Sequence, residues 1–348
     1  MKLADLLKEA IKIGASDVHL TVGIKPAARV NGGLEELTGE VIDETEIIKL
    51  VESMLSQKEK EILEEEGEVD FAYKLGEQRF RVNAFQQKDN LAAVLRIIPA
   101  RILSLSELGL PEILGELALK PRGLFLVTGP TGSGKSTTLA AMIDLVNREL
   151  DRHIVTLEDP IEYIHQHKKG IVNQRAVGND TKSFAKGLKS ALRQDPDMIL
   201  VGEMRDLETI STAITAAETG HLVLATLHTN SAAETIERIV DVFPPHQQSQ
   251  IRTQLSLTLE GVLSQQLLPT INNLDRVVAT ELLIANAAAK NLIREGKTHQ
   301  IDSILQTNND SGMHSMDYSL RDLYLNGKIS REMALNKANN LETLKNLI

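Results

Sequence analysis

The stretch that decides the fold is GLFLVTGPTGSGKSTTLAAMIDLVN, residues 123–147. It begins with an apolar run of strand length, 123–128, and ends in a helix-like run that follows a glycine-rich turn. The turn, 129–136, matches the GxxxxGKS pattern of a phosphate loop, with strand and helix where that pattern requires them. The sequence therefore predicts a βα unit whose connecting loop binds the phosphates of a nucleotide.

The residue types of this loop suit that chemistry. Glycines let backbone N–H groups approach phosphate oxygens without a side-chain clash, and the following helix directs its positive end at the same anion. Lys135 supplies a positive charge for the outer phosphates, and the Ser136 hydroxyl can coordinate Mg²⁺. We therefore expect the nucleotide to be bound by Thr131, Gly132, Ser133, Gly134, Lys135, Ser136 and Thr137.

Three more apolar runs of strand length follow the loop, at 153–158, 198–203 and 221–227, with helix-like stretches between them. Strands that are apolar on both faces and separated by helices favour a mostly parallel sheet in an α/β domain. The run 276–284 predicts a late strand, and residues 287–348 predict short helices that close the domain.

Residues before the loop show a different pattern. Apolar residues at helical spacing open the chain, the Asn31-Gly32 pair indicates a tight hairpin, and Asp43 begins a second helix. Strand-like segments then follow. We expect an α+β domain over residues 1–98, a linker over 99–111 where a proline and broken periodicity occur, and the α/β domain over 112–348.

Carboxylates accompany the ends of two predicted strands. Glu203 follows the apolar run MILV, and Glu158, Asp159 and Glu162 cluster at the end of the run HIVTL. Ligands of parallel sheets gather at the carboxyl ends of the strands, where an acid can reach a water or Mg²⁺ beside the phosphate loop. We expect catalytic or metal-positioning roles for Glu203 and for the 158–162 cluster. The spacing leaves open which acid of the cluster faces the nucleotide.

Histidines stand at both ends of the strand predicted within 219–229. His228 lies at its carboxyl end, beside the expected nucleotide, and His221 lies at the opposite end. Each is compatible with an ordinary polar residue, although a histidine at position 228 can contact a γ-phosphate and report it to a neighbour. The pair His165 and His167 has no third ligand in view, and we expect it to be solvated and not metal-binding.

The composition excludes several classes of protein. A chain of 348 residues is too long for one ordinary core and predicts two domains. A net charge of −10 and an aromatic content of 3% argue against nucleic-acid binding, which needs basic faces and stacking side chains. The chain has no cysteine, which removes disulfides, thiol catalysis and cysteine-bound zinc. The apolar runs are too short to span a bilayer, so we expect no direct membrane insertion and no export.

Four sequence blocks occur in order: GPTGSGKST, TLEDPIE, DPDMILVGEMRD and TGHLVLATLHT. Together they resemble the Walker A, Asp box, Walker B and His box of the secretion and type IV pilus ATPases. The stretches GASDVHL, RFRVNAF and NLIREGKTHQI look like segments of the pilus-retraction branch, so the resemblance covers nearly the whole chain. It implies a PAS-like N-terminal domain, a RecA-like C-terminal ATPase domain, and hydrolysis of ATP with Mg²⁺.

The resemblance also implies roles for single residues. Glu203 matches the catalytic glutamate and, with Ser136, is expected to hold the metal. Arg81 and Arg96 match arginines that complete the site from a neighbouring subunit of a homohexamer, and arginine suits the charge that develops on a γ-phosphate. The remaining matched positions are Glu162, Glu158, His228 and His221.

At the level of the cell, the resemblance implies a motor that retracts type IV pili and drives twitching motility through nucleotide-dependent domain movement. Its implied partners are the pilus machinery and a PilC-like platform protein of the inner membrane. The motor is then expected in the cytoplasm, peripheral at the inner face of the cytoplasmic membrane.

One motif departs from the retraction branch, which carries AIRNLIRE. Residues 288–295 read AAKNLIRE here, with Ala289 and Lys290 in place of isoleucine and arginine. Losing a large apolar side chain removes about 2–5 kcal/mol of packing where the site is buried. The change leaves room for a weakly hydrolysing accessory retraction ATPase.

Two other classes share a RecA-like core. Pilus-extension and type II secretion ATPases tend to carry a longer N-terminal region and a four-cysteine zinc site, and the short first domain without cysteine speaks against them. A DNA translocase needs a basic channel or stacking aromatics, which the composition opposes.

Overall fold

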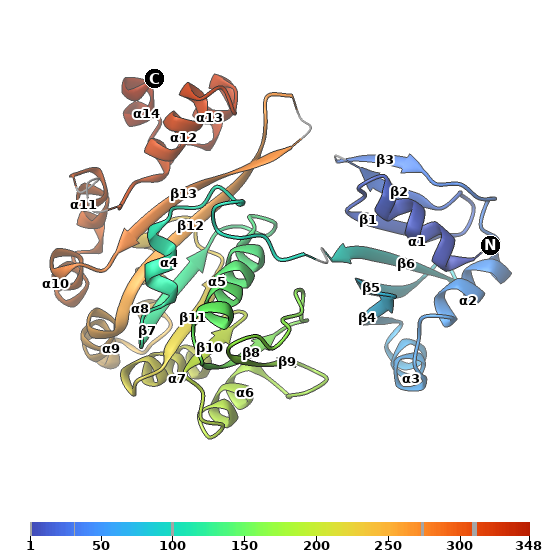
Figure 1. Cartoon of the computed structure of the whole chain (residues 1–348), viewed down its shortest axis with the longest axis horizontal. Coiled ribbons are helices and arrows are strands. Elements are labelled where there is room, and N and C mark those ends of the chain that lie inside the picture. Colours follow the sequence, from blue (N-terminus) through green and yellow to red (C-terminus); the bar gives the residue numbers. More distant parts are fainter. Residues whose placement is uncertain (1, 31, 99–100, 273–274, 308–311) are drawn as a thin grey trace. The chain divides into compact units, whose positions relative to one another are not determined.

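The computed structural model describes residues 2–30, 32–98, 101–272, 275–307 and 312–348. Internal contacts divide the chain into two compact units, Met1–Arg101 and Ile102–Ile348, and Figure 1 labels the elements of each. Residues 99–100 of the expected linker and Asn31 of the expected hairpin turn lie outside the described residues.

The first unit is built on a six-stranded antiparallel sheet with the strand order β3-β2-β1-β6-β5-β4. Its strands are β1 (Asp17–Thr21), β2 (Ala27–Val30), β3 (Gly33–Glu36), β4 (Glu68–Leu75), β5 (Gln78–Gln87) and β6 (Asn90–Ile98). Its helices are α1 (Leu3–Lys12), α2 (Glu44–Glu52) and α3 (Gln57–Glu66). Asp43 caps α2 as predicted, because its Oδ1 accepts a hydrogen bond from Glu46 N at 2.7 Å.

One face of this sheet packs against the three helices. Leu95 of β6 and Val82 of β5 are fully buried there, among the apolar side chains of α1, α2 and α3. Side chains alternate along a strand. Arg96, which follows Leu95, and Arg81, which precedes Val82, therefore point to the opposite face of the sheet. The expected α+β unit is confirmed, and its sheet is antiparallel, with Arg81 and Arg96 on the face opposite the helices.

The second unit contains a seven-stranded sheet with the order β13-β12-β7-β11-β10-β8-β9. All neighbouring pairs are parallel except β12 and β13, which confirms the predicted α/β class. Its strands are β7 (Gly123–Thr128), β8 (His153–Glu158), β9 (Ile171–Ala176), β10 (Met198–Val201), β11 (Leu222–Leu227), β12 (Leu259–Pro269) and β13 (Arg276–Ile284). The apolar runs predicted all of these except β9 and β12.

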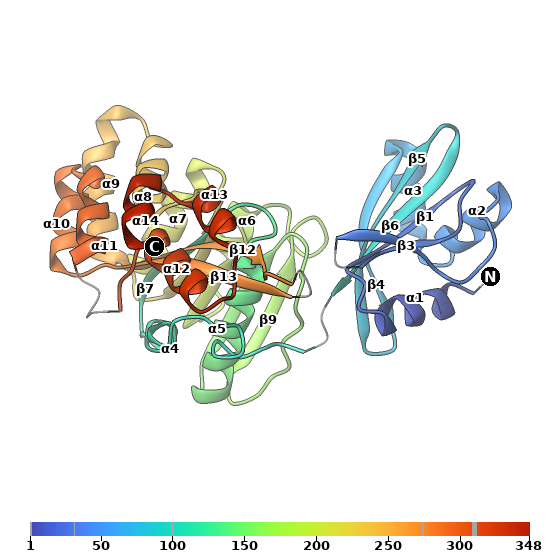
Figure 2. The same cartoon turned by 90° about the horizontal axis from the view of Figure 1, so that it is seen from above.

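Helices cover both faces of this sheet, so its central strands are apolar throughout. Leu124 and Leu126 of β7 face α6 to α11, whereas Phe125 and Val127 face α4 and α5, and Figure 2 shows these two layers. The helices are α4 (Ile113–Ala118), α5 (Lys135–Glu149), α6 (Phe184–Ala191), α7 (Leu207–Glu218), α8 (Ala232–Asp241), α9 (Pro245–Thr258), α10 (Ala287–Glu295), α11 (Ile301–Thr307), α12 (Met316–Leu325), α13 (Arg331–Lys337) and α14 (Leu341–Leu347).

The last three helices, α12 to α14, form a separate small core with the ends of β12 and β13 (Figure 1). Leu268 of β12 and Ala279 of β13 are buried there with Leu320 and Leu344 of the helices. The expected short closing helices are therefore present. Within the described residues, no helix combines the length and the apolar character that crossing a membrane requires.

Candidate active site

The phosphate loop joins β7 to α5, which begins at Lys135. Gly129 has a φ angle of 138°, which an L side chain rarely adopts. A Cβ atom at this position would lie 2.3 Å from the carbonyl oxygen of Gln265 on β12 and 2.7 Å from Ser133 Oγ. Glycine is therefore required at the first turn of the loop, and the loop backbone lies directly against the neighbouring strand.

Lys135 lies over this loop and near two carboxylates. Its ammonium donates to the carbonyl oxygens of Gly129 at 2.7 Å and Pro130 at 3.0 Å. Burial lowers the pKa of Lys135, while the negative charges of Glu203 and Glu162 act in the opposite direction. The fold thus brings the acids of two distant sequence blocks to the cation of a third.

The backbone on either side of Glu203 is hydrogen-bonded to the ends of β8 and β11. Gly202 N donates to Leu157 O of β8 at 2.8 Å, and Met204 N donates to Thr226 O of β11 at 3.1 Å. Because β8, β10 and β11 are parallel, this segment lies at their common carboxyl edge. The structure therefore places Glu203 at the edge from which the phosphate loop also emerges.

Both carboxylate oxygens of Glu203 have a cationic or polar partner. Arg205 Nη2 lies 2.7 Å from Oε2, and His228 Nε2 lies 3.2 Å from Oε1. Burial raises the pKa of Glu203, but the hydrogen bonds and charges of Arg205 and His228 outweigh burial, so the pKa lies below its usual value. Glu203 is thus an ionised, mostly buried carboxylate that can accept a proton from water or bind a cation.

The Asp-box acids have different surroundings. Glu158 accepts hydrogen bonds from Thr156 Oγ1 at 2.5 Å, from Gln174 Nε2 at 3.1 Å and from the backbone of Glu162. Burial raises the pKa of Glu158 despite these hydrogen bonds. Glu158 therefore ties the loop to β8 and β9, whereas the charge of Glu162 acts on Lys135.

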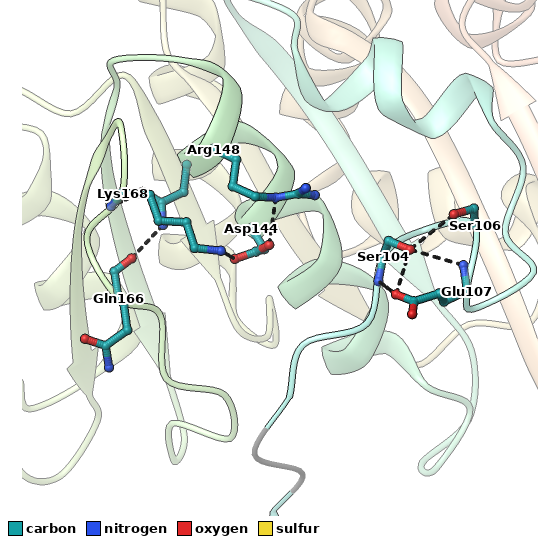
Figure 3. A network of polar contacts seen from close by, with 8 residues as sticks. Ser104, Ser106, Glu107, Asp144, Arg148, Gln166 and Lys168 are labelled. Carbon is teal, nitrogen blue, oxygen red and sulfur yellow. Dashed lines mark hydrogen bonds and ion pairs between the residues drawn. The ribbon is translucent and has the colours of Figure 1, made fainter. Parts of the chain in front are cut away.

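Two further contacts attach the Asp-box loop to α5. The hydroxyl groups of Thr137 and Tyr163 lie 2.9 Å apart. Asp144 of α5 forms an ion pair with Lys168 of the loop at 2.5 Å and, within α5, a second one with Arg148 at 3.0 Å, as Figure 3 shows. Because α5 also starts at the phosphate loop, these contacts hold the segment that follows the Asp-box acids against the helix that begins at that loop.

Comparison with known proteins identifies the family. The model of the family described as "Type II/IV secretion system protein" matches residues 2–319. Over 339 residues the chain is 49% identical to the type IV pilus retractation ATPase PilT of Pseudomonas aeruginosa, covering 97% of this chain and 98% of that protein. This chain belongs to the type II/IV secretion system protein family. The chain is accordingly an ATPase of that family.

Two further relatives agree with this assignment. The type IV pilus ATPase PilU of Pseudomonas aeruginosa is 42% identical over 349 residues, covering 100% of this chain and 91% of that protein. A crystal structure of the pilus retraction motor PilT with bound ADP superposes with a TM-score of 0.93 at 51% identity, over 99% of each chain. The expected fold of this secretion ATPase, with an antiparallel N-terminal sheet and a mostly parallel ATPase sheet, is thereby confirmed.

The two arginines matched to the secretion family lie on the first unit, side by side. Arg81 of β5 is the direct cross-strand partner of Arg96 of β6. Arg96 Nε donates to Asp17 Oδ1 at 2.9 Å, and Arg81 Nε lies 3.8 Å from Asp70 Oδ1. The structure therefore brings the two arginines together on the polar face of this sheet.

The two His-box residues lie at opposite ends of β11. His228 contacts Glu203, whereas Nδ1 of His221 lies 2.9 Å from Ala216 O at the end of α7. His221 O also accepts a hydrogen bond from Gly123 N, at the start of β7. Six residues of β7 at about 3.3 Å each separate that point from the phosphate loop. Only His228 of the pair joins the acidic cluster of this secretion ATPase.

The expectation for His165 was wrong. Its side chain is buried at 7% exposure, and burial lowers its pKa to about 4. His167 is exposed, as expected, and its Nδ1 accepts a hydrogen bond from Val172 N at 3.1 Å. Alternation along a strand would place both histidines on one face, so their opposite environments follow from the irregular backbone between β8 and β9.

Sequence reasoning missed two residues of this site. Arg205 was not singled out, although it stands two positions after Glu203 in the Walker B block. Gln265 lies on β12, which no apolar run predicted, and its Nε2 donates to Thr138 Oγ1 of α5 at 2.9 Å. The signal for Arg205 was present in the sequence, whereas Gln265 reaches the phosphate loop only through strand pairing.

The site fits a nucleotide with Mg²⁺. The buried Ser133 Oγ has no hydrogen-bond partner among the described residues, and the Ser136 hydroxyl is exposed at the first turn of α5. Hydroxyl and carboxylate oxygens are the ligands that Mg²⁺ takes beside phosphates, so Ser136 and Glu203 suit it. Lys135 and the inward backbone of the loop suit the phosphates themselves.

Proposed function

We propose that this secretion ATPase is a homohexameric motor that retracts a type IV pilus. Near full-length similarity to a protein named as a pilus retraction ATPase supports the assignment. The observation that carries it is the cluster of Glu203, Arg205 and His228 beside the lysine of the phosphate loop. Such a cluster is suited to turnover, because an ionised carboxylate there can activate a water.

In this proposal the residues around the phosphates divide into those that neutralise charge, those that hold Mg²⁺ and those that activate water. Lys135 neutralises the outer phosphates, and bound Mg²⁺, held by Ser136 and Glu203, would add positive charge there. Glu203 accepts the proton of the attacking water, while His228 and Arg205 keep its carboxylate ionised and oriented. Glu162 and Glu158 assist from the Asp box, Glu158 by holding the loop and Glu162 by its charge. The loop residues Thr131, Gly132, Ser133, Gly134 and Thr137 complete the contacts.

Arg81 and Arg96 act, in the proposal, on ATP bound by the neighbouring subunit. Guanidinium groups stabilise the charge that develops on the γ-phosphate during its transfer. Hydrolysis then changes these contacts, and the N-terminal domain (1–98) moves against the ATPase domain (112–348) about the linker (99–111). His221, the other His-box residue, lies at the end of β11 away from the phosphate loop, so it is placed for contacts other than those with the phosphates.

The motion needs a partner on which to act. The pilus names of the relatives support a PilC-like platform protein of the inner membrane, and the pilus machinery beyond it. The motor then works in the cytoplasm, peripheral at the inner face of the cytoplasmic membrane. Deleting the gene in its host, scored for surface pili, tests this part: excess pili with lost twitching motility support retraction, and bare cells refute it.

The enzymatic part is tested by Glu203→Gln. The variant should bind ATP as the wild type does, because the phosphate loop is unchanged, and lose at least about 100-fold in kcat. The matched control is Glu208→Gln. Glu208 is an exposed glutamate five residues after Glu203, and its ion pair with Lys189 lies on the surface. Full-speed phosphate release by Glu203→Gln would refute the role of this carboxylate.

A second function, an accessory retraction ATPase with slow turnover, is favoured by one observation. Ala289 is fully buried in the core of the ATPase unit, where the retraction branch has isoleucine. The similarity to a protein named as the type IV pilus ATPase PilU is compatible with it. Steady-state phosphate release with Mg²⁺ decides: turnover near background supports the accessory role.

A further inference from the structure

Asp17 begins β1 and is largely buried, at 8% exposure. Its two oxygens have different partners: Oδ1 accepts from Arg96 Nε at 2.9 Å, and Oδ2 accepts from Ser16 Oγ at 2.8 Å. The Arg96 side chain remains 60% exposed. A buried carboxylate thus holds one end of an arginine whose other end faces outward.

The strand register gives this carboxylate a particular place. Asp17 is paired with Arg29 of β2 on one side and with Arg96 of β6 on the other, and Arg96 is paired with Arg81 of β5. Four strands therefore contribute one row of three arginines and a single acid. Like charges directly opposite on a sheet destabilise each other, so the acid within the row offsets that repulsion.

The contact uses the inner nitrogen of the guanidinium. With Nε bound to Asp17, neither Nη atom of Arg96 has a hydrogen bond within the described residues. The guanidinium is planar, so fixing Nε also fixes the plane in which the two Nη groups present their hydrogens. Arg81 is held less firmly, because its ion pair with Asp70 is 3.8 Å long and Asp70 is 55% exposed.

We propose that Asp17 is a positioning residue for ATP hydrolysis. It holds Arg96 by Nε so that both Nη groups are directed at the γ-phosphate of ATP bound by a second copy of this chain. The inference rests on the proposed function, in which Arg96 completes the neighbouring site. Ser16 supports the arrangement by occupying the second oxygen of Asp17.

The test is a double-mutant cycle in the full-length chain. We expect Asp17→Ala to lower kcat about tenfold with little change in KM, because a misdirected group loses transition-state contacts and not substrate binding. Asp17→Asn keeps an oxygen acceptor for Nε and should recover part of the loss. In an Arg96→Ala background, Asp17→Ala should change kcat by less than about twofold, since its target is absent.

Phosphate release is measured against ATP concentration, at protein concentrations where every variant sediments as the wild type does. The control, Glu36→Gln, breaks the exposed Lys25–Glu36 ion pair of the same unit and should leave kcat unchanged. The inference is overturned if Asp17→Ala keeps wild-type kcat while Arg96→Ala is impaired, or if the double variant loses the full additional tenfold. Wild-type kcat in Arg96→Ala would instead refute the arginine assignment on which the inference rests.

Discussion

Replacing Glu281 with glutamine removes a buried carboxylate from the junction between β13 and the C-terminal helices. Glu281 is 2% exposed. Its oxygens accept hydrogen bonds from Ala232 N at 2.8 Å, at the start of α8, and from Met316 N at 3.4 Å, at the start of α12. Burial raises its pKa to about 7, and the hydrogen bonds oppose this rise only in part. The nearby charges of Asp302 and Asp317 raise it further.

The magnitude follows from proton linkage. In the unfolded chain Glu281 ionises near its ordinary pKa of 4.5, and in the folded protein near 7. Between these values the folded state binds more protons, so the free energy of unfolding falls as pH rises. At about 1.4 kcal/mol per pH unit, ionisation of Glu281 lowers the free energy of unfolding by about 3 kcal/mol across this window. Glutamine mimics the protonated acid and has no such dependence.

Urea unfolding followed by circular dichroism, at intervals from pH 4.5 to pH 8, measures this difference. Relative to the wild type, the free energy of unfolding of the variant should rise by about 3 kcal/mol from pH 4.5 to pH 8, whatever the difference in stability between the two proteins at pH 4.5. Glu332→Gln, an exposed glutamate at the start of α13, serves as the control and should show a constant difference. A constant difference for Glu281→Gln as well would refute the reasoning.

Three other perturbations have expected outcomes. Gly129→Ala should weaken ATP binding by at least about tenfold, since its Cβ would lie 2.3 Å from Gln265 O and displace the loop; calorimetric titration measures it. Arg205→Ala should raise the pKa of Glu203 and move the acidic limb of the pH–rate profile to higher pH, because its hydrogen bond and charge lower that pKa. Ala289→Ile should destabilise the folded protein by about 1–3 kcal/mol through overpacking, as measured by thermal unfolding.

Each of these outcomes has a control or a contradicting result. Gly115→Ala, whose Cβ would meet only Leu145 Cδ2 at 3.6 Å, should bind ATP normally. Unchanged affinity in Gly129→Ala would show that the loop tolerates a side chain. An acidic limb that stays in place in Arg205→Ala would separate this arginine from the titration of Glu203. An Ala289→Ile variant that is more stable than the wild type would mean that the core has an unfilled space there.

The phosphate loop and most of the sheet follow from the sequence. Continuous apolar runs predicted β7, β8, β10, β11 and β13, because strands covered by helices on both faces have no polar side. The strand β12 escaped prediction, since Ser264, Gln265 and Gln266 interrupt its apolar run. Ser264 and Gln265 are tolerated because they lie beside the phosphate loop, where Ser264 bonds Thr128 and Gln265 bonds Thr138, whereas Gln266 donates to Lys337 O near the C-terminal helices.

The sequence by itself determined which residue types the site contains: a lysine in a glycine-rich loop, and acids at strand ends. Only the tertiary structure decided what each of these residues contacts. The sequence could not distinguish Glu158 from Glu162 as the acid that faces the nucleotide. In the structure, packing of β9 buries Glu158 against Gln174, whereas the charge of Glu162 acts on Lys135. Strand direction separates the two His-box residues, and strand register places Asp17 beside Arg96, 79 residues away in sequence. Local patterns carry information about neighbours in the chain, whereas these contacts arise from pairing and burial between distant segments.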